Sequence, residues 1–482
     1  MSKPIIVLLS NALRLADNAA LSEAVSSGAP VIPVFIFDEQ SPKVRPLGAA
    51  SKWWLLQSLS NLSSRLKAMG SMLVVRRGVA AKTVQELVEE TDAGAVHVMR
   101  GYTPSARALE EQLHEIYADT DIRIRRFAGN LLIEPEAVRT KTGNPYTVFS
   151  PFWRAASVLI DTVAPQPTPT KLLAPKDWPA NDGVESLGLE PQPAYWAEPI
   201  AEAWVPGEAA ALDRLRSFLD GPVLDYKAAR DFPAIDATSA LSPYLAFGEI
   251  GPRTIWWHTK LQMNANESIT KGAAHFLREL GWREFSSHLL FNQPHMQSEP
   301  MRQQFRDFPW IEGEGDFLTA WQKGLTGFPI VDAGMRQLWQ TGWMHNRVRM
   351  IVASFLVKDL LWHWREGETW FWDTLVDADF GNNIASWQWV AGCGADAAPY
   401  FRIFNPITQG EKFDPKGDYV RRYVPELADM PNNYIHKPFE APVGELQMAG
   451  VKLGSTYPKP IVNRKIAREK ALAALASIKK PD

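Results

Sequence analysis

The stretch Ile5-Ile6-Val7-Leu8-Leu9 is the first of five short stretches of strand character that alternate with helical patterns. Runs of this length and composition indicate strands, and the other four cover residues 31–37, 72–76, 95–99 and 122–126. The helices expected between them cover residues 19–26, 50–69, 82–90 and 105–117. This alternation predicts an α/β domain with a parallel five-stranded, Rossmann-like sheet that helices cover on both faces.

The turn after the first strand lacks a nucleotide signature. It reads Ser10-Asn11-Ala12-Leu13, whereas dinucleotide-binding domains carry Gly-x-Gly-x-x-Gly at this point. An α/β domain without that fingerprint does not reveal its ligand.

The pattern changes twice further along the chain. Eight of the 36 prolines fall between residues 165 and 199, which predicts a long connection wrapped over the surface. After residue 207 the periodicity is helical, with helices expected at 209–219, 252–263, 273–291, 331–341, 346–364, 369–375 and 464–480. We therefore expect an α/β domain over 1–135, a Pro-rich linker over 136–207 and a large all-α domain over 208–482.

Composition excludes several classes of protein. Of the 482 residues, 46% are hydrophobic and 22% charged, which is typical of globular proteins and argues against disorder. The single cysteine, Cys393, excludes an intramolecular disulfide, a thiolate zinc cage and a four-cysteine iron–sulfur cluster, and we expect no metal site. A net charge of −3 requires any nucleic-acid site to be a local basic patch. With no apolar run of membrane-spanning length, we expect a cytoplasmic protein, and we expect it to be a monomer.

Four clusters of residues in the helical part are candidates for chemistry. Hydroxyl groups gather at the start of a predicted helix in residues 238–242, where an anion site and an ordinary helix cap are both possible. Glu279, Trp282 and Arg283 share one side of another helix, either as a surface ion pair beside a core indole or as a site that holds a base. Nineteen tryptophans are unusually many, and some of them could carry stacking or electrons.

The other two clusters follow later. In Gly342-Trp343-Met344-His345-Asn346-Arg347-Val348-Arg349-Met350, the residues Asn346, Arg349 and Met350 lie within one helical turn. Arg347 and Arg349 face different directions, which suits one arginine pointing at DNA and one pointing inward. The inward one requires a buried acid or an anionic ligand, for which Asp377 and Asp379 are the candidates. Residues 377–389 run from polar side chains into Trp387 and Trp389, which point in nearly opposite directions on a helix.

Together these strings resemble the photolyase/cryptochrome family. They are Thr238-Ser239-Ala240-Leu241-Ser242, Trp282-Arg283-Glu284-Phe285, residues 342–347, Trp387-Gln388-Trp389 and residues 396–406. The resemblance covers essentially the whole chain. Residues 332–336 are also similar to plant cryptochromes, and this mixture resembles the bacterial class III cyclobutane pyrimidine dimer photolyases.

The resemblance implies a light-driven DNA repair flavoprotein with FAD in the helical domain, fully reduced when active. It implies deoxyribodipyrimidine photolyase activity, a carbon–carbon lyase reaction on UV-damaged DNA. It also implies an FAD pocket lined by Tyr226, Thr238, Ser239, Ala240, Leu241, Ser242, Arg283, Arg349, Asp377, Ala378, Asp379 and Asn383. In that pocket Asn383 would lie opposite the flavin N5, and Arg349 would pair with Asp377.

The resemblance also assigns the lesion, the electron relay and the DNA contacts. Photolyases for (6-4) photoproducts carry histidines where this chain has Asn346 and Met350, so cyclobutane dimers are the expected substrate. The implied substrate residues are Glu279, Trp282, Asn346, Arg347, Met350 and Trp389. The implied electron relay consists of Trp310, Trp364 and Trp387, and the suspected DNA contacts are Arg230, Arg347, Lys412, Arg421 and Arg422.

The antenna cofactor is expected to be 5,10-methenyltetrahydrofolate, with a deazaflavin as the alternative. The stretch Tyr102-Thr103-Pro104-Ser105 departs from the Asn-Glu pair of class I enzymes, so their folate geometry does not transfer. Phe37 and Glu39, at the carboxyl end of a strand, are the expected pocket residues.

Two other functions remain open from the sequence. A cryptochrome-type blue-light photoreceptor would signal through a protein partner, but plant receptors carry Asp at the position of Asn383, and only 25 residues follow Tyr457. An NAD(P)H-dependent flavin oxidoreductase has no nicotinamide fingerprint to support it.

Overall fold

The computed structural model describes residues 2–161, 163–396 and 401–478. Contacts between residues divide the chain into two compact units, each assembled from separate segments. Unit 1 comprises residues 1–224, 239–294 and 376–381, and unit 2 comprises 225–238, 295–375 and 382–482. The domain limits expected from composition, at 135 and 207, stay a prediction.

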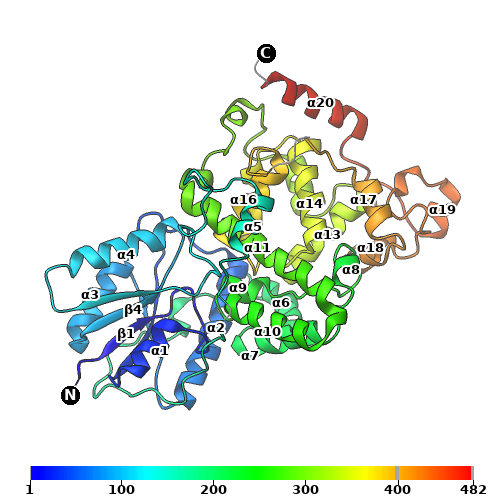
Figure 1. Cartoon of the computed structure of the whole chain (residues 1–482). Coiled ribbons are helices and arrows are strands. Elements are labelled where there is room, and N and C mark those ends of the chain that lie inside the picture. The colour runs from blue at the N-terminus through cyan, green and yellow to red at the C-terminus, as the bar shows by residue number, and fades with distance from the viewer. Residues whose placement is uncertain (1, 162, 397–400, 479–482) are drawn as a thin grey trace. The chain divides into compact units, whose positions relative to one another are not determined.

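Unit 1 contains the five-stranded parallel sheet that the alternation predicts. Its strands are β1 (Ile5–Leu8), β2 (Val31–Phe37), β3 (Val74–Arg77), β4 (Ala95–Met99) and β5 (Arg123–Phe127). They pair in the order β3-β2-β1-β4-β5, with every pair parallel (Figure 1). The Rossmann-like prediction is confirmed, and the strand ends differ from it by no more than two residues.

Helices cover both faces of this sheet, because successive side chains of each strand point to opposite sides. Ile5 and Val7 of β1 pack with apolar residues of α1 (Ala19–Ser26) and α2 (Ala49–Ala68). Ile6 and Leu8 pack with residues of α3 (Ala80–Thr91) and α4 (Pro104–Ile116) on the opposite face. The two resulting cores place the sheet in the middle of a three-layer arrangement.

Residues from beyond position 240 contact the loop that follows β1, at the carboxyl edge of the sheet where α/β domains usually place a nucleotide. Arg14 follows β1, is 2% exposed, and donates to the backbone oxygens of Gly248 (3.0 Å) and Gly129 (3.2 Å). Gly248 has φ +67°, and a Cβ there would lie 2.2 Å from the backbone oxygen of Asn11, so only glycine fits. Arg253 Nε donates to Asp17 Oδ1 at 2.9 Å.

The proline-rich stretch lies along the same sheet. Val31 N donates to Leu173 O at 2.8 Å, and Asp182 N donates to Val75 O at 2.9 Å, so this stretch is hydrogen-bonded to two strands. It contains the short helices η1 (Glu185–Leu187) and η2 (Ala194–Trp196), and α5 (Phe149–Ala156) and α6 (Ala197–Ala203) flank it.

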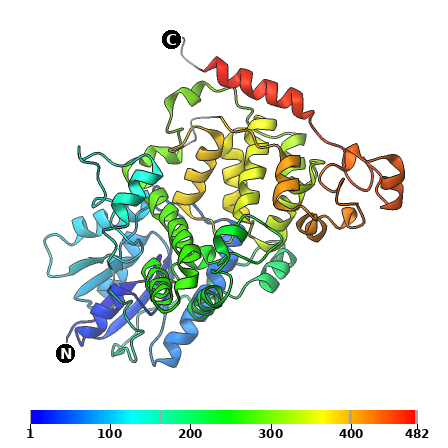
Figure 2. The same cartoon turned by 45° about the vertical axis from the view of Figure 1, so that its right-hand side comes forward.

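The remaining helices of unit 1 are α7 (Glu208–Asp220), α9 (Ser242–Ala246), α10 (Pro252–Ala265), η3 (Glu267–Ile269) and α11 (Thr270–Asn292). The long helix α11 packs against α5 and α10 (Figure 2). Gly272 makes one close approach on α11 possible, because a Cβ there would lie 1.8 Å from Val223 O.

Regular structure in the described part of unit 2 is helical apart from two isolated bridges. The helices before residue 360 are α8 (Tyr226–Ala229), η5 (Gln303–Asp307), α12 (Asp316–Gln322), α13 (Pro329–Thr341), α14 (Asn346–Ser354) and the π-helix η6 (Phe355–Asp359). The short helix η4 (Pro294–Gln297) spans the boundary between the units. The later helices are α15 (Trp364–Thr374), α16 (Phe380–Ala391), which also begins in unit 1, α17 (Pro406–Phe413), α18 (Asp418–Tyr423), η7 (Pro425–Leu427), η8 (Pro438–Glu440), α19 (Val443–Met448) and α20 (Arg464–Ser477).

The expectation of one helix over 346–364 is wrong. The α-helix ends at Ser354 and continues as one π turn, in which Leu360 N donates to Phe355 O at 3.0 Å. Leu361 then adopts φ +59°, and Trp362 forms a bridge with Ile311. A new helix, α15, starts at Trp364 with His363 as its cap. The apolar periodicity of the sequence continues through this break, so the sequence pattern gave no signal that the helix is interrupted.

Candidate functional site

The start of α14 is held by the histidine that precedes it. His345 is 3% exposed, and its Nδ1 accepts a hydrogen bond from Arg347 N at 3.2 Å. Burial lowers the pKa of His345 to about 4, so the ring is neutral at pH 7. This cap positions the first turn of α14, where Asn346 is exposed.

Arg347 connects three neighbours on this face of unit 2. Its Nη2 lies 2.9 Å from Asp231 Oδ1, and its guanidinium lies 4.5 Å from the centre of the Phe413 ring. Its Nη1 contacts Met350 Sδ at 3.8 Å. Asn346 and Met350 are four residues apart on α14 and share its face, so the structure brings these three predicted substrate residues together.

Four further cations of unit 2 were predicted to bind DNA. Lys412 and Arg422 are exposed, with Lys412 Nζ 4.9 Å from the centre of the Phe413 ring and Arg422 Nη2 donating to Ala234 O at 3.4 Å. Arg230 lies over the ring of Tyr226 at 5.3 Å.

Arg421, the fourth cation, is bound within the protein. Its Nε donates to Ala428 O at 2.8 Å, and its Nη2 donates to Met430 O at 2.6 Å and to Asn432 Oδ1 at 2.9 Å. The side chain therefore holds the segment after α18 in place.

On α16, Trp387 and Trp389 have different partners, as expected for residues two positions apart. Trp387 is 2% exposed and meets Phe371 edge-to-face, with ring centroids 5.0 Å apart. Trp389 is half-buried, and its Nε1 donates to Asp396 O at 3.1 Å. Residues 397–400 of the following motif lie outside the described residues.

A glycine lets Trp387 pack on the helix that carries Trp364. Gly367 is three residues after Trp364 on α15, so the two share a helix face. A Cβ at Gly367 would lie 2.0 Å from the Trp387 ring, which means that the indole packs directly on the backbone of this face. Trp364 is 1% exposed, while Trp310 is half-buried. Trp387 and Trp364 are thus more deeply buried than Trp310.

Two predicted site residues on α11 contact partners that sequence reasoning missed. Trp282 stacks on Phe149 of α5 with ring centroids 3.7 Å apart, and Arg283 pairs with the buried Glu284 at 3.0 Å. Glu284 also accepts from Leu132 N at 2.7 Å. The adjacent letters Arg-Glu gave a signal for this pair, whereas nothing near residue 149 pointed to the stack.

Glu279, also on α11, lies one turn before Trp282 and Arg283. Its Oε1 is 3.9 Å from His275 Nε2.

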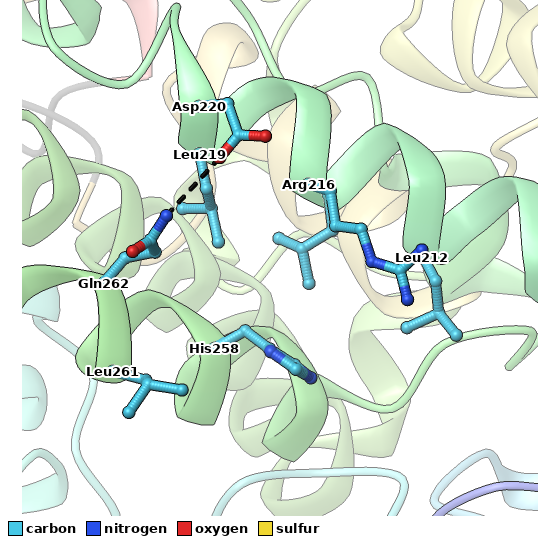
Figure 3. A pocket seen from close by; sticks show the side chains of 8 residues that line it. Leu212, Arg216, Leu219, Asp220, His258, Leu261 and Gln262 are labelled. Atoms are coloured by element: carbon cyan, nitrogen blue, oxygen red, sulfur yellow. Dashed lines mark hydrogen bonds between the residues drawn. The ribbon is translucent and has the colours of Figure 1, made fainter. Parts of the chain in front are cut away.

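A shallow groove between α7 and α10 lies elsewhere in unit 1. Leu212, Leu219 and Leu261 line it together with His258, and Gln262 Nε2 donates to Asp220 Oδ1 at 3.4 Å across it (Figure 3). None of the predicted cofactor or substrate residues lines this groove.

Comparisons with known proteins agree with this arrangement. Residues 5–171 match the profile of the family described as DNA photolyase, and residues 276–477 match the FAD binding domain of DNA photolyase. The deoxyribodipyrimidine photo-lyase of Agrobacterium fabrum is 51% identical over 479 residues, which are 99% of this chain and 98% of that protein. The chain belongs to the DNA photolyase family.

A solved photolyase structure and a plant cryptochrome are also similar to this chain over nearly its whole length. A bacterial class III photolyase from Agrobacterium tumefaciens superposes with a TM-score of 0.96 and 50% identity, covering 100% of this chain and 98% of the other. Cryptochrome-1 of Arabidopsis thaliana is 36% identical over 98% of this chain and 70% of that protein. The predicted family, the α/β domain with a helical FAD-binding domain, and the class III relationship are confirmed.

Asn383 presents a hydrogen-bond acceptor that fits a reduced flavin. It is 8% exposed, and its Nδ2 donates to Glu368 O at 3.0 Å and to Glu368 Oε1 at 2.7 Å. Because the amide protons are directed to Glu368, the other polar atom of the side chain, Oδ1, is an acceptor. An acceptor suits the N–H that a reduced flavin carries at N5.

The other predicted FAD residues of this photolyase are divided between the two units. Tyr226, Thr238 and Arg349 belong to unit 2, while residues 239–242, Arg283 and residues 377–379 belong to unit 1. Their common pocket therefore stays a prediction, as does the pairing of Arg349 with Asp377. Locally, Ala240 has φ +47°, and Ser242 is exposed at the first position of the five-residue helix α9.

The predicted antenna residues follow β2. Phe37 is 5% exposed beneath the guanidinium of Arg77, which is 5.0 Å from the ring centre. Glu39 Oε1 lies 2.9 Å from Lys52 Nζ. The antenna site stays a prediction.

Across the described part of the chain, no helix is both long and apolar enough to span a membrane.

Proposed function

We propose that this photolyase splits cyclobutane pyrimidine dimers in DNA, using blue light and a fully reduced FAD. The observation that carries the proposal is the face of α14, where an amide (Asn346) and a thioether (Met350) flank Arg347. Neither of the two flanking groups is an acid or a base at neutral pH. Splitting a cyclobutane dimer requires one electron and its return, so the face suits a reaction without proton transfer to the lesion.

A bound reduced flavin would supply, on excitation by light, the electron that breaks the two C–C bonds, and that electron would return to it. The protein's own residues would hold the flipped dimer, a process that photolyases share with other enzymes acting on bases. Trp282 and Trp389 would form its apolar walls, and Glu279 would hydrogen-bond the dimer as negative charge develops on it. Asn383 Oδ1 would accept from the flavin N5–H.

Trp387, Trp364 and Trp310 would supply electrons from the surface when the flavin is oxidised. The decrease in burial along this series supports that direction, because the last donor should exchange electrons with solvent reductants. The antenna would be 5,10-methenyltetrahydrofolate, and the absorbance spectrum of the purified protein would distinguish it from a deazaflavin.

The function is tested by light-dependent repair. Purified protein is incubated with one oligonucleotide that carries a cyclobutane dimer and another that carries a (6-4) photoproduct, in blue light and in the dark. We expect the dimer to be repaired in light only and the (6-4) lesion to persist. Repair in the dark, or equal repair of both lesions, would contradict the proposal.

DNA binding is expected to depend on exposed cations. Arg422→Ala should reduce the slope of log affinity against log salt by about one unit, because one phosphate contact is lost. Arg421→Ala is the comparison variant. The Arg421 side chain is hydrogen-bonded to Met430 and Asn432, so its removal should lower the thermal stability of the protein. An unchanged salt slope in folded Arg422→Ala protein would remove Arg422 from the interface.

A cryptochrome-type photoreceptor is the second candidate, favoured by the 36% identity to Cryptochrome-1 over 98% of this chain. A photoreceptor would show normal light-driven changes of the flavin but would repair neither the cyclobutane dimer nor the (6-4) photoproduct.

A further inference from the structure

His363 occupies a fixed position between two segments of unit 2. It ends the irregular stretch after η6 and caps α15, with its Nδ1 accepting from Arg365 N at 3.1 Å. Its backbone N donates to Ile311 O at 2.8 Å, and Ile311 N donates to Leu361 O at 2.8 Å. These bonds align the chain at residue 311 with the chain at residue 363, so Trp310 is held beside the histidine.

The imidazole contacts the indoles of both outer relay tryptophans. The His363 and Trp310 ring centroids are 5.6 Å apart with the planes at 71°, an edge-to-face contact. The His363 and Trp364 centroids are 5.4 Å apart with the planes at 32°. Both separations fall in the range of direct aromatic contacts. The ring therefore joins the half-buried indole to the fully buried one.

The hydrogen bond to Nδ1 determines the charge and tautomer of this ring. Because Nδ1 accepts from Arg365 N, the proton of the neutral ring lies on Nε2. Burial lowers the pKa of His363 to about 4, with Glu312 raising it and Arg365 lowering it to smaller extents. At neutral pH the ring carries no charge, and it has no available acceptor for a proton from an indole.

We propose that His363 is a positioning residue of the electron relay, whose neutral ring packs between Trp364 and Trp310 and couples them electronically. The inference rests on the proposed function, since it requires the tryptophan relay. In this step one electron passes from Trp310 to an oxidised Trp364. Trp310 is oxidised and Trp364 is reduced, while His363 gains no electron and moves no proton.

Two substitutions separate the ring from the helix cap. His363→Asn keeps an oxygen that can cap α15 but removes the aromatic ring. His363→Phe keeps a ring between the indoles but removes the capping atom. We expect His363→Asn to lose the long-lived Trp310 radical while the earlier Trp387 radical still forms, and we expect His363→Phe to retain both.

The readout is transient absorption of the tryptophan radicals in FAD-loaded protein, beside the thermal unfolding midpoint of each variant. If His363→Phe loses the long-lived radical and His363→Asn keeps it, the cap matters and the proposal is overturned. Normal radical lifetimes in both variants would overturn it as well.

Trp387→Phe protein, measured in the same way, separates this inference from the function on which it rests. If that variant photoreduces normally, the relay itself fails. If it does not photoreduce while His363→Asn behaves as wild type, only the role of His363 fails.

Discussion

Trp387→Phe is expected to abolish photoreduction of oxidised FAD and to leave repair by pre-reduced protein nearly intact. A phenyl ring is far harder to oxidise than an indole, so the first electron could not leave position 387. Repair is spared because the electron that splits the dimer comes from the flavin itself. Packing should tolerate the change, since the smaller ring still meets Phe371 and the backbone at Gly367.

The two activities are measured on the same preparation. Flavin absorbance is followed under blue light with an external reductant, and dimer repair is followed after chemical reduction in the dark. Trp256→Phe is a matched control, because this indole is 7% exposed in unit 1 and outside the relay. Photoreduction at the normal rate in Trp387→Phe would exclude the relay, and equal losses in both variants would indicate a general loss of stability.

Trp389→Ala is expected to weaken binding of dimer-containing DNA by about 1–3 kcal/mol, the usual cost of removing an aromatic stacking partner. Photoreduction should persist, because Trp389 directs its indole to Asp396 and not to the Phe371 side where Trp387 packs. Binding titrations with damaged and undamaged oligonucleotides measure the effect, which should appear only with the damaged one.

Trp389→Phe separates stacking from the hydrogen bond. It keeps an aromatic face but loses the Nε1–H that donates to Asp396 O. If stacking dominates, Trp389→Phe retains most of the affinity that Trp389→Ala loses. Equal weakening in both variants would instead assign the effect to the segment at Asp396, and unchanged affinity in Trp389→Ala would remove Trp389 from the lesion site.

Sequence patterns predicted the sheet well, because short apolar or alternating stretches are separated by helices of different periodicity. They failed at residues 355–363, where the π turn and the left-handed Leu361 interrupt a helix without changing its apolar character. Because of that break, His363 caps a new helix, α15, which starts at Trp364. The positions of His363 and Trp364 could therefore not be predicted from apolar periodicity.

Motifs predicted candidate site residues but not the side chains that hold them. Asn383 was identified by resemblance, whereas its partner Glu368 lies on another helix, fifteen residues earlier. Arg347 was expected to bind DNA or the lesion, and its contacts with Asp231 and Phe413 were not foreseen. These partners are distant in sequence and have ordinary residue types, so no local pattern distinguishes them from surface charges and core aromatics.

The contacts between the loop after β1 and residues beyond position 240 have a consequence for synthesis on the ribosome. Arg14 and Asp17 follow the first strand, yet Gly248 and Arg253, which satisfy them, are translated more than 230 residues later. Until then the growing chain holds the Arg14 cation and the Asp17 anion without the partners that Gly248 and Arg253 later supply. A fragment that ends after β5 would keep this deficit permanently, so this amino-terminal fragment should depend on chaperones or on the later segment supplied in trans.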